Sequence, residues 1–108
     1  MNFLVIPRTE FADMQSAYLV CYDIADPKRW RLVHKIMLGN GDPLQLSVFL
    51  CVLTRKQRQI LIGRLREVMH HGEDALAIID LGPADTAEER ITTFGKVHLE
   101  AGKRHVVV

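Results

Sequence analysis

The chain has 108 residues, of which 48% are apolar and 25% are charged, and its formal net charge is +1. This length suits one domain around a single core, and the composition excludes a disordered or collagen-like chain. No apolar run approaches the ~20 residues of a membrane-spanning helix, so we expect neither a membrane span nor an export signal.

The charge is distributed unevenly along the chain. Residues 27–66 carry nine Lys or Arg against a single acidic residue, and the remainder is net negative. A separation of this kind favours a polyanionic partner on one face of the molecule. Two solvated helix faces explain it about equally well, and the charge alone does not decide between them.

Cysteine usage predicts the compartment. Cys21 and Cys51 stand thirty positions apart on apolar segments, without a CxxC pair or a larger cysteine framework. We therefore expect reduced thiols in the core of a cytoplasmic protein. A facultative disulfide between neighbouring strands is the alternative.

The first predicted elements are a strand and a helix. The strand runs from Tyr18 to Ile24, with Asp23 near its end. Asp26 offers a helix cap, Pro27 suits the first helical position, and Gly39 provides a stop. Helical spacing predicts a side that faces the core and an opposite, basic side. These sides consist of Trp30, Val33, Ile36 and Met37, and of Lys28, Arg31 and Lys35.

A second strand and helix follow in the middle of the chain. The apolar segment from Leu44 to Leu53 is ten residues long, which predicts a bend, a bulge or two short strands. Thr54 and Gln57 fit a capping box for a helix from Arg55 to about Met69. We expect Gly72 to end this helix.

The last third of the chain predicts a strand at Asp74–Leu81, broken by Gly82 and Pro83, and a short final strand at Ile91–Phe94. The order βαββαβ predicts an α+β, ferredoxin-like sandwich with an antiparallel sheet. Two helices then cover one sheet face, and the other face and an edge are left for a partner, commonly a second copy. The expected divisions are an N-terminal extension (1–16), the ferredoxin-like domain (17–96) and a C-terminal tail (97–108).

Three segments carry a family resemblance. They are YLVCYDIADPKRWRLVHKIMLGNG, LQLSVF and the closing ITTFGK. In order and spacing they resemble the small CRISPR-associated family called Cas-two. The resemblance implies a homodimer in which a strand such as Ile91–Phe94 pairs across to the other protomer. It also implies a metal-dependent endonuclease acting on RNA or DNA, or a non-catalytic centre of the spacer-acquisition complex that holds an integrase subunit along DNA.

The resemblance also implies a set of site residues. Asp23 matches the catalytic, metal-associated aspartate of the family. Positions near that site, with expected nucleic-acid contacts, match Tyr22, Arg29, Arg31, Ser47 and Phe49. The chain departs from the family at Leu50, where Glu is frequent, and at Pro43, where Arg is frequent. Both departures remove polar groups, which weakens the case for cleavage more than that for DNA binding or dimer formation.

The chemistry expected of Asp23 depends on a second copy. One carboxylate is a poor Mg²⁺ site, because Mg²⁺ is usually held by one or two carboxylates together with water and phosphate oxygens. Two carboxylates about 4 Å apart repel by roughly 4 kcal/mol at an effective dielectric constant near 20. A pair of Asp23 side chains on a two-fold axis would therefore share a proton or bind Mg²⁺ between the protomers. The alternative is that Asp23 caps the strand end or pairs with Arg29 or Arg31.

The other site residues also have alternative interpretations. Arg29 and Arg31 suit forked contacts to phosphates, or they are exposed helix charges of little energetic weight. Phe49 and Tyr22 offer rings for base stacking, although single aromatic residues in apolar runs are usually core residues. For the whole protein the alternatives are an architectural DNA-binding subunit, a toxin-type ribonuclease or a small-ligand regulatory domain.

Overall fold

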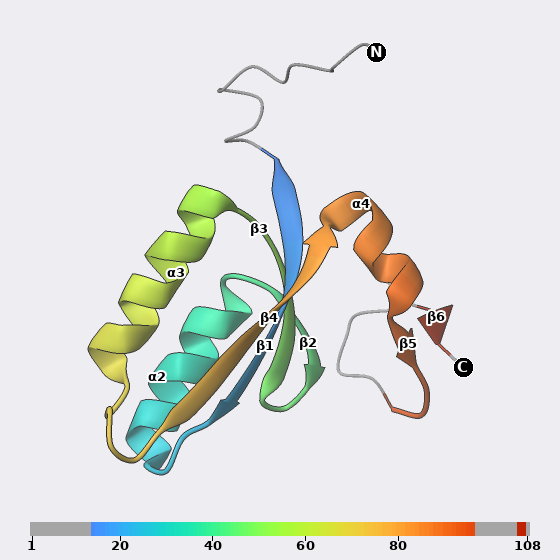
Figure 1. Cartoon of the computed structure of the whole chain (residues 1–108). Helices are drawn as coiled ribbons and strands as arrows, with labels where there is room; N and C mark the ends of the chain where they lie inside the picture. Colours follow the sequence, from blue (N-terminus) through green and yellow to red (C-terminus); the bar gives the residue numbers. More distant parts are fainter. Residues whose placement is uncertain (1–13, 97–105, 108) are drawn as a thin grey trace.

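The computed structural model describes residues 14–96 and 106–107. In this part of the chain a four-stranded antiparallel sheet of order β2-β3-β1-β4 has two long helices on one face (Figure 1). The order βαββαβ confirms the predicted α+β, ferredoxin-like class. Its elements are β1 (Gln15–Asp23), α2 (Pro27–Leu38), β2 (Asp42–Gln45), β3 (Val48–Thr54), α3 (Arg55–Val68) and β4 (Ala75–Pro83).

Four short elements follow β4. They are the helix α4 (Ala84–Ala87), the 3₁₀ turn η1 (Glu88–Arg90) and the strands β5 (Thr92–Thr93) and β6 (Val106–Val107). Strand β5 lies inside the predicted final strand and pairs with β6 of the same chain in parallel. Most of the predicted N-terminal extension and C-terminal tail, residues 1–13, 97–105 and 108, lies outside the described residues.

The main core lies between the sheet and the two long helices. Strand β1 alternates, so that Tyr18, Val20 and Tyr22 point toward the helices and are buried. Phe49 and Cys51 of β3 join them on the same face, because β3 is paired with β1 in register. Helices α2 and α3 contribute their apolar sides to this cluster. Their fully buried members are Val33, Met37, Leu61 and Leu65.

Helix α2 begins and ends where the sequence predicts. The Asp26 side chain caps it by accepting a hydrogen bond of 2.9 Å from the backbone N–H of Arg29. Gly39 follows the last residue in a right-handed conformation, with φ −81°. Two residues further on, Gly41 is required for space: a Cβ there would lie 2.5 Å from Sγ of Cys51.

The long apolar segment is a hairpin. Strands β2 and β3 flank a turn at Leu46 and Ser47, and the pairing shifts between Pro43 and Gln45. Proline is tolerated there because β2 is an edge strand. The alternative of two short strands, stated for residues 44–53, is confirmed.

Helix α3 starts at the predicted capping box and ends within one residue of the predicted Met69, but Gly72 is not its stop. Thr54 Oγ1 accepts from the N–H of Gln57 at 3.2 Å, and the Gln57 side chain accepts from the N–H of Thr54 at 2.9 Å. The helix ends at Val68, four residues before Gly72. The reason is Asp74, whose carboxylate accepts the N–H of His70 at 2.7 Å and takes it out of the helical pattern.

A second, smaller cluster covers one end of the opposite sheet face. Helix α4 packs on β1 and β4 there, with Ala17, Leu50 and Ala87 buried against one another. The rest of this face, toward Asp23, has no element over it in the described part of the chain (Figure 1). No described helix is both long and apolar enough to cross a membrane.

Candidate nucleic-acid interface and metal-binding residue

Asp23 lies at the end of β1 with its side chain on the open face of the sheet. The alternation of the strand requires this, since the preceding Tyr22 points into the core. Asp23 is exposed, and in the described residues its carboxylate has neither a hydrogen-bond nor an ion-pair partner. The alternative pairing of Asp23 with Arg29 is therefore not formed, and the carboxylate is free to bind a ligand.

The surface around Asp23 is apolar and built from small residues. Ala75 is its register partner on β4, and Ala77 is paired with Cys21 beside it. Both alanines are exposed, and further along the strand Ile79 keeps 47% of its surface exposed. Small exposed side chains of this kind allow another macromolecule to approach Asp23 closely.

Directly beneath Asp23, Tyr22 belongs to a buried aromatic network. Its hydroxyl lies 2.8 Å from Nδ1 of His34 and donates to the carbonyl oxygen of Leu46 at 3.3 Å. The rings of Tyr22 and Phe49 are stacked at 6.1 Å, and His34 meets Phe49 edge-on at 5.6 Å. Burial raises the pKa of the Tyr22 phenol to about 12. Tyr22 therefore fixes the position of the end of β1 through its contacts in the core.

Phe49 is a core residue. Its ring has no exposed surface, and it packs under the two rings named above. A base cannot stack on a ring that is covered on all sides, so we assign Phe49 to the core and not to a nucleic-acid contact.

Ser47 and Trp30 join the β2–β3 turn to helix α2. The indole Nε1 of Trp30 donates to Oγ of Ser47 at 3.3 Å, and the Trp30 ring stacks on His34 at 4.5 Å. The carbonyl oxygen of Ser47 also accepts the N–H of Tyr22 at 3.1 Å. Ser47 thus lies next to the end of β1, beside Asp23, and Trp30 is a half-buried residue packed against the core, as predicted.

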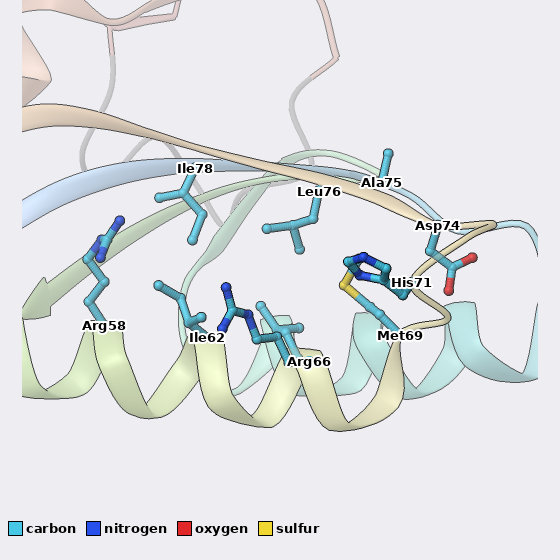
Figure 2. A pocket seen from close by; sticks show the side chains of 10 residues that line it. Arg58, Ile62, Arg66, Met69, His71, Asp74, Ala75, Leu76 and Ile78 are labelled. Atoms are coloured by element: carbon cyan, nitrogen blue, oxygen red, sulfur yellow. The ribbon is translucent and has the colours of Figure 1, made fainter.

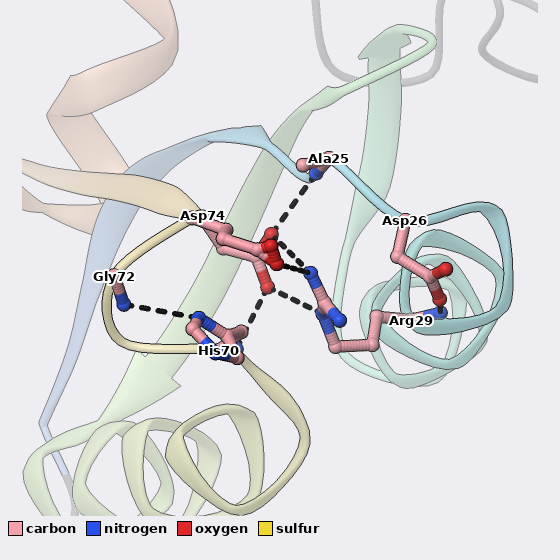
Figure 3. A network of polar contacts seen from close by, with 7 residues as sticks. Ala25, Asp26, Arg29, His70, Gly72 and Asp74 are labelled. Carbon is pink, nitrogen blue, oxygen red and sulfur yellow. Dashed lines mark hydrogen bonds and ion pairs between the residues drawn. The ribbon is translucent and has the colours of Figure 1, made fainter.

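Arg29 is held in an ion pair with Asp74 (Figure 3). Its Nε donates to Oδ2 at 2.9 Å and its Nη2 to Oδ1 at 3.2 Å, and Glu73 lies 3.5 Å away. The Arg29 side chain holds the pKa of the Asp74 carboxyl well below its usual range, helped by the N–H groups of His70 and Ala25. Most of the donor capacity of Arg29 is used inside the protein.

The other basic residues of helix α2 face solvent. Arg31 is exposed, as are Lys28 and Lys35 on the same helix. Their side lies opposite to Val33 and Met37, which are buried. This arrangement confirms the predicted division of the helix into a core side and a basic side, and it leaves Arg31 able to contact a phosphate.

Two residues of the site were missed by the sequence interpretation. His34 was not assigned a role, because a lone histidine on an amphipathic helix gives no pattern to recognise. Asp74 was assigned to a strand, although it precedes β4. Its side chain bonds to Ala25 and to Arg29, which lie 49 and 45 positions earlier in the chain. Only its place between a turn and an apolar run hints at a capping role.

A metal ion has few ligands in a single chain. No group of three or more His, Cys, Asp or Glu able to hold a metal ion occurs among the described residues. The exposed carboxylate of Asp23 fits one ligand of a hydrated Mg²⁺, which prefers oxygen and keeps several waters. Both cysteines are free, and Cys51 is buried in the core, which raises the pKa of its thiol to about 12.

A groove of about 900 Å³ runs between α3 and the edge strand β4 (Figure 2). Apolar side chains make up much of its lining, and cationic side chains stand along it. The apolar residues include Ile62, Leu65, Met69, Leu76 and Ile78, the cationic ones are Arg58 and Arg66, and His71 and Asp74 also line the groove. The groove lies along the side of β4 that is not paired with β1.

The fold and the exposed aspartate at a strand end define a ferredoxin-like protein with a candidate metal-binding carboxylate. A family model described as CRISPR associated protein Cas2 matches residues 16–89. The chain belongs to this CRISPR-associated family. It is 38% identical over 95 residues to a CRISPR-associated endoribonuclease Cas2 of Geobacter sulfurreducens, covering 88% of this chain and all of the relative.

Two further comparisons agree. A CRISPR-associated endoribonuclease Cas2 of Rhodospirillum rubrum is 41% identical over 88 residues, covering 82% of this chain and 86% of the relative. The crystal structure of Streptococcus pyogenes Cas2 at pH 6.5 is similar with a TM-score of 0.66 and 30% identity. That similarity covers 73% of this chain and 99% of the other.

Proposed function

We propose that the chain is a metal-dependent endonuclease that acts as a homodimer in the spacer-acquisition step of CRISPR immunity. The observation that carries this proposal is the exposed carboxylate of Asp23 on an open sheet face, where it has no partner among the described residues. The names of the relatives, CRISPR-associated endoribonucleases, supply the reaction class. The proposed compartment is the cytoplasm, where free cysteines stay reduced.

Asp23 would bind Mg²⁺ together with Asp23 of a second copy. When bound, Mg²⁺ supplies a Lewis acid and a water of lowered pKa for attack on a phosphodiester. Two neighbouring residues would hold the Asp23 carboxylate in place. The Tyr22 side chain anchors the end of β1 in the core, and the carbonyl oxygen of Ser47 accepts the backbone N–H of Tyr22. Neither of these residues needs to touch the nucleic acid for this role.

The proposed homodimer uses the open sheet face and the free edge of β4. The exposed alanines beside Asp23 let two sheets approach each other, and Phe94, 77% exposed, is an uncovered aromatic residue next to β5. In a dimer, β5 of the second copy would add to β4 and cover part of the groove along α3. Contacts across a two-fold axis would bring the two Asp23 residues to one cleft.

Binding to nucleic acid is proposed to be independent of sequence. The exposed basic side of α2, with Arg31, can neutralise backbone phosphates, and no described element is suited to read base edges. The same dimer would hold DNA for an integrase subunit, which is the second candidate function. It is favoured by Leu50, which replaces a frequent family Glu and is fully buried under α4.

The test is cleavage of labelled RNA and duplex DNA with Mg²⁺ or EDTA, for the wild type, Asp23→Asn and Asp23→Ala. We expect cleavage that requires the metal and falls at least about 100-fold in both variants, because a metal ligand is lost. Glu67→Gln, an exposed acid on α3, removes one negative charge elsewhere and serves as the control. Cleavage that persists in both Asp23 variants would contradict the proposal. A wild type that binds DNA but cuts nothing supports the integrase-holding function instead.

A further inference from the structure

Asp74 is a buried carboxylate at the junction of α3 and β4. Its side chain has no exposed surface. It accepts the N–H of His70 at 2.7 Å and that of Ala25 at 2.9 Å, in addition to the two hydrogen bonds from Arg29. A buried carboxylate is costly unless its oxygens are satisfied, so these four donors fix its position. Figure 3 shows the donors converging on it from the connection between β1 and α2, from the first turn of α2 and from the connection between α3 and β4.

The Asp74 carboxylate connects two backbone segments next to Asp23: the residues that follow Asp23 in sequence and the start of the neighbouring strand β4. Ala25 comes two residues after Asp23 and bonds directly to Asp74. Ala75, the residue after Asp74, is the register partner of Asp23 on β4. Asp74 therefore connects the segment that carries Asp23 to the strand beside it. It acts in addition to the contact between Tyr22 and His34, which joins the end of β1 to α2 from the core side.

We propose that Asp74 and Arg29 form one unit that positions Asp23. The inference rests on the proposed function. It assigns Asp74 and Arg29 as positioning residues, which affect the reaction only by holding Asp23 in place. Arg29 belongs to this unit because its guanidinium orients the Asp74 carboxylate. It therefore serves Asp23 indirectly and is not a phosphate contact. Displacement of a catalytic group by about 1 Å costs up to about 100-fold in rate, which sets the scale of the effect.

Steady-state kinetics of Asp74→Asn, Arg29→Gln and the double variant test the unit, each measured on protein shown to be folded. We expect kcat to fall about 10- to 100-fold, with KM within about twofold, because orientation and not binding is lost. The double variant should be no slower than the slower single variant, since the two residues act together. Additive losses, or full activity in Asp74→Asn, would overturn the inference.

Salt dependence separates positioning from phosphate contact. The affinity for duplex DNA is measured against salt for the wild type, Arg29→Gln and Arg31→Gln. We expect an unchanged slope for Arg29→Gln, and a slope smaller by about 1 for Arg31→Gln, whose charge faces solvent. A smaller slope together with a higher KM in Arg29→Gln would show that Arg29 binds a phosphate, and the inference would fail.

Hydrogen exchange keeps the two hypotheses separate. If the wild type does not cleave, the proposed function fails, and the anchor is judged by the exchange rate of the Ala25 amide. We expect Asp74→Asn to accelerate exchange at least about tenfold there and not in Leu50–Leu53, with Glu67→Gln as the control. Unchanged exchange at Ala25 would overturn the inference. If Asp74→Asn does not fold, Arg29→Gln undergoes the same measurements.

Discussion

At the scale of single residues, neighbours along the sequence have different tasks. Asp23 is exposed and has no partner in the part of the chain that the structure describes, whereas Tyr22 before it is buried and bonded to His34. Arg29 and Arg31 differ in the same way, because one is held by Asp74 and the other faces solvent. Strand alternation and helical periodicity cause both contrasts. Residues that match a family motif side by side therefore need not share a role.

The ion pair of Asp74 predicts a pH dependence of stability. Its folded-state pKa lies below that of an unfolded aspartate, about 3.9, so its contribution is fully present above that value. It is lost as the pH falls through this value toward the folded-state pKa. Urea unfolding from pH 7 to pH 3 should show the free-energy gap between wild type and Asp74→Asn shrinking with acidification. A gap that stays constant with pH would exclude the ion pair as its cause.

At the scale of elements, the features that depend on neighbouring residues could be predicted from the sequence. The contacts between residues far apart in the chain could not. The caps at Asp26 and Thr54 lie within three residues of their partners, so the starts of both long helices could be predicted. The end of α3 was predicted to within one residue, but the bond from His70 to Asp74 at that end could not be predicted. For the same reason the site was predicted at Asp23, while the anchors of Tyr22 and Arg29, at His34 and Asp74, were not.

The aromatic network gives a prediction for Tyr22→Phe. This change removes the hydroxyl and leaves the carbonyl oxygen of Leu46 and Nδ1 of His34 without their bond. We expect the free energy of unfolding to fall by about 1 kcal/mol, the typical net value of a hydrogen bond. The control is Tyr18→Phe, because the Tyr18 hydroxyl has no hydrogen bond in the described residues. Urea unfolding measures the free energy of unfolding of both variants and of the wild type. Equal losses in Tyr22→Phe and Tyr18→Phe would argue against a structural role for the network.

At the scale of the whole molecule, the sheet is covered on one face and only partly covered on the other. Helices α2 and α3 cover most of one face, leaving the groove between α3 and β4, while α4 reaches only the end of the other face near Ala17. The open part contains Asp23, exposed alanines and the edge strand β4. Such a surface with a candidate catalytic group at its rim is better explained as one half of a site than as a complete one.

Oligomeric state tests this explanation directly. Ala77 lies exposed on the open face beside Cys21, so Ala77→Arg should place a bulky charge between two copies. By sedimentation equilibrium we expect a dimeric wild type and a dimer dissociation constant raised at least about 100-fold, equivalent to about 2.7 kcal/mol, in the variant. Ile60→Arg, at a 53% exposed position of α3, should leave the dimer intact. Because the proposed metal site takes one Asp23 carboxylate from each copy, cleavage should fall with the dimer in Ala77→Arg. A wild type that is monomeric and still cleaves would show that one Asp23 is enough.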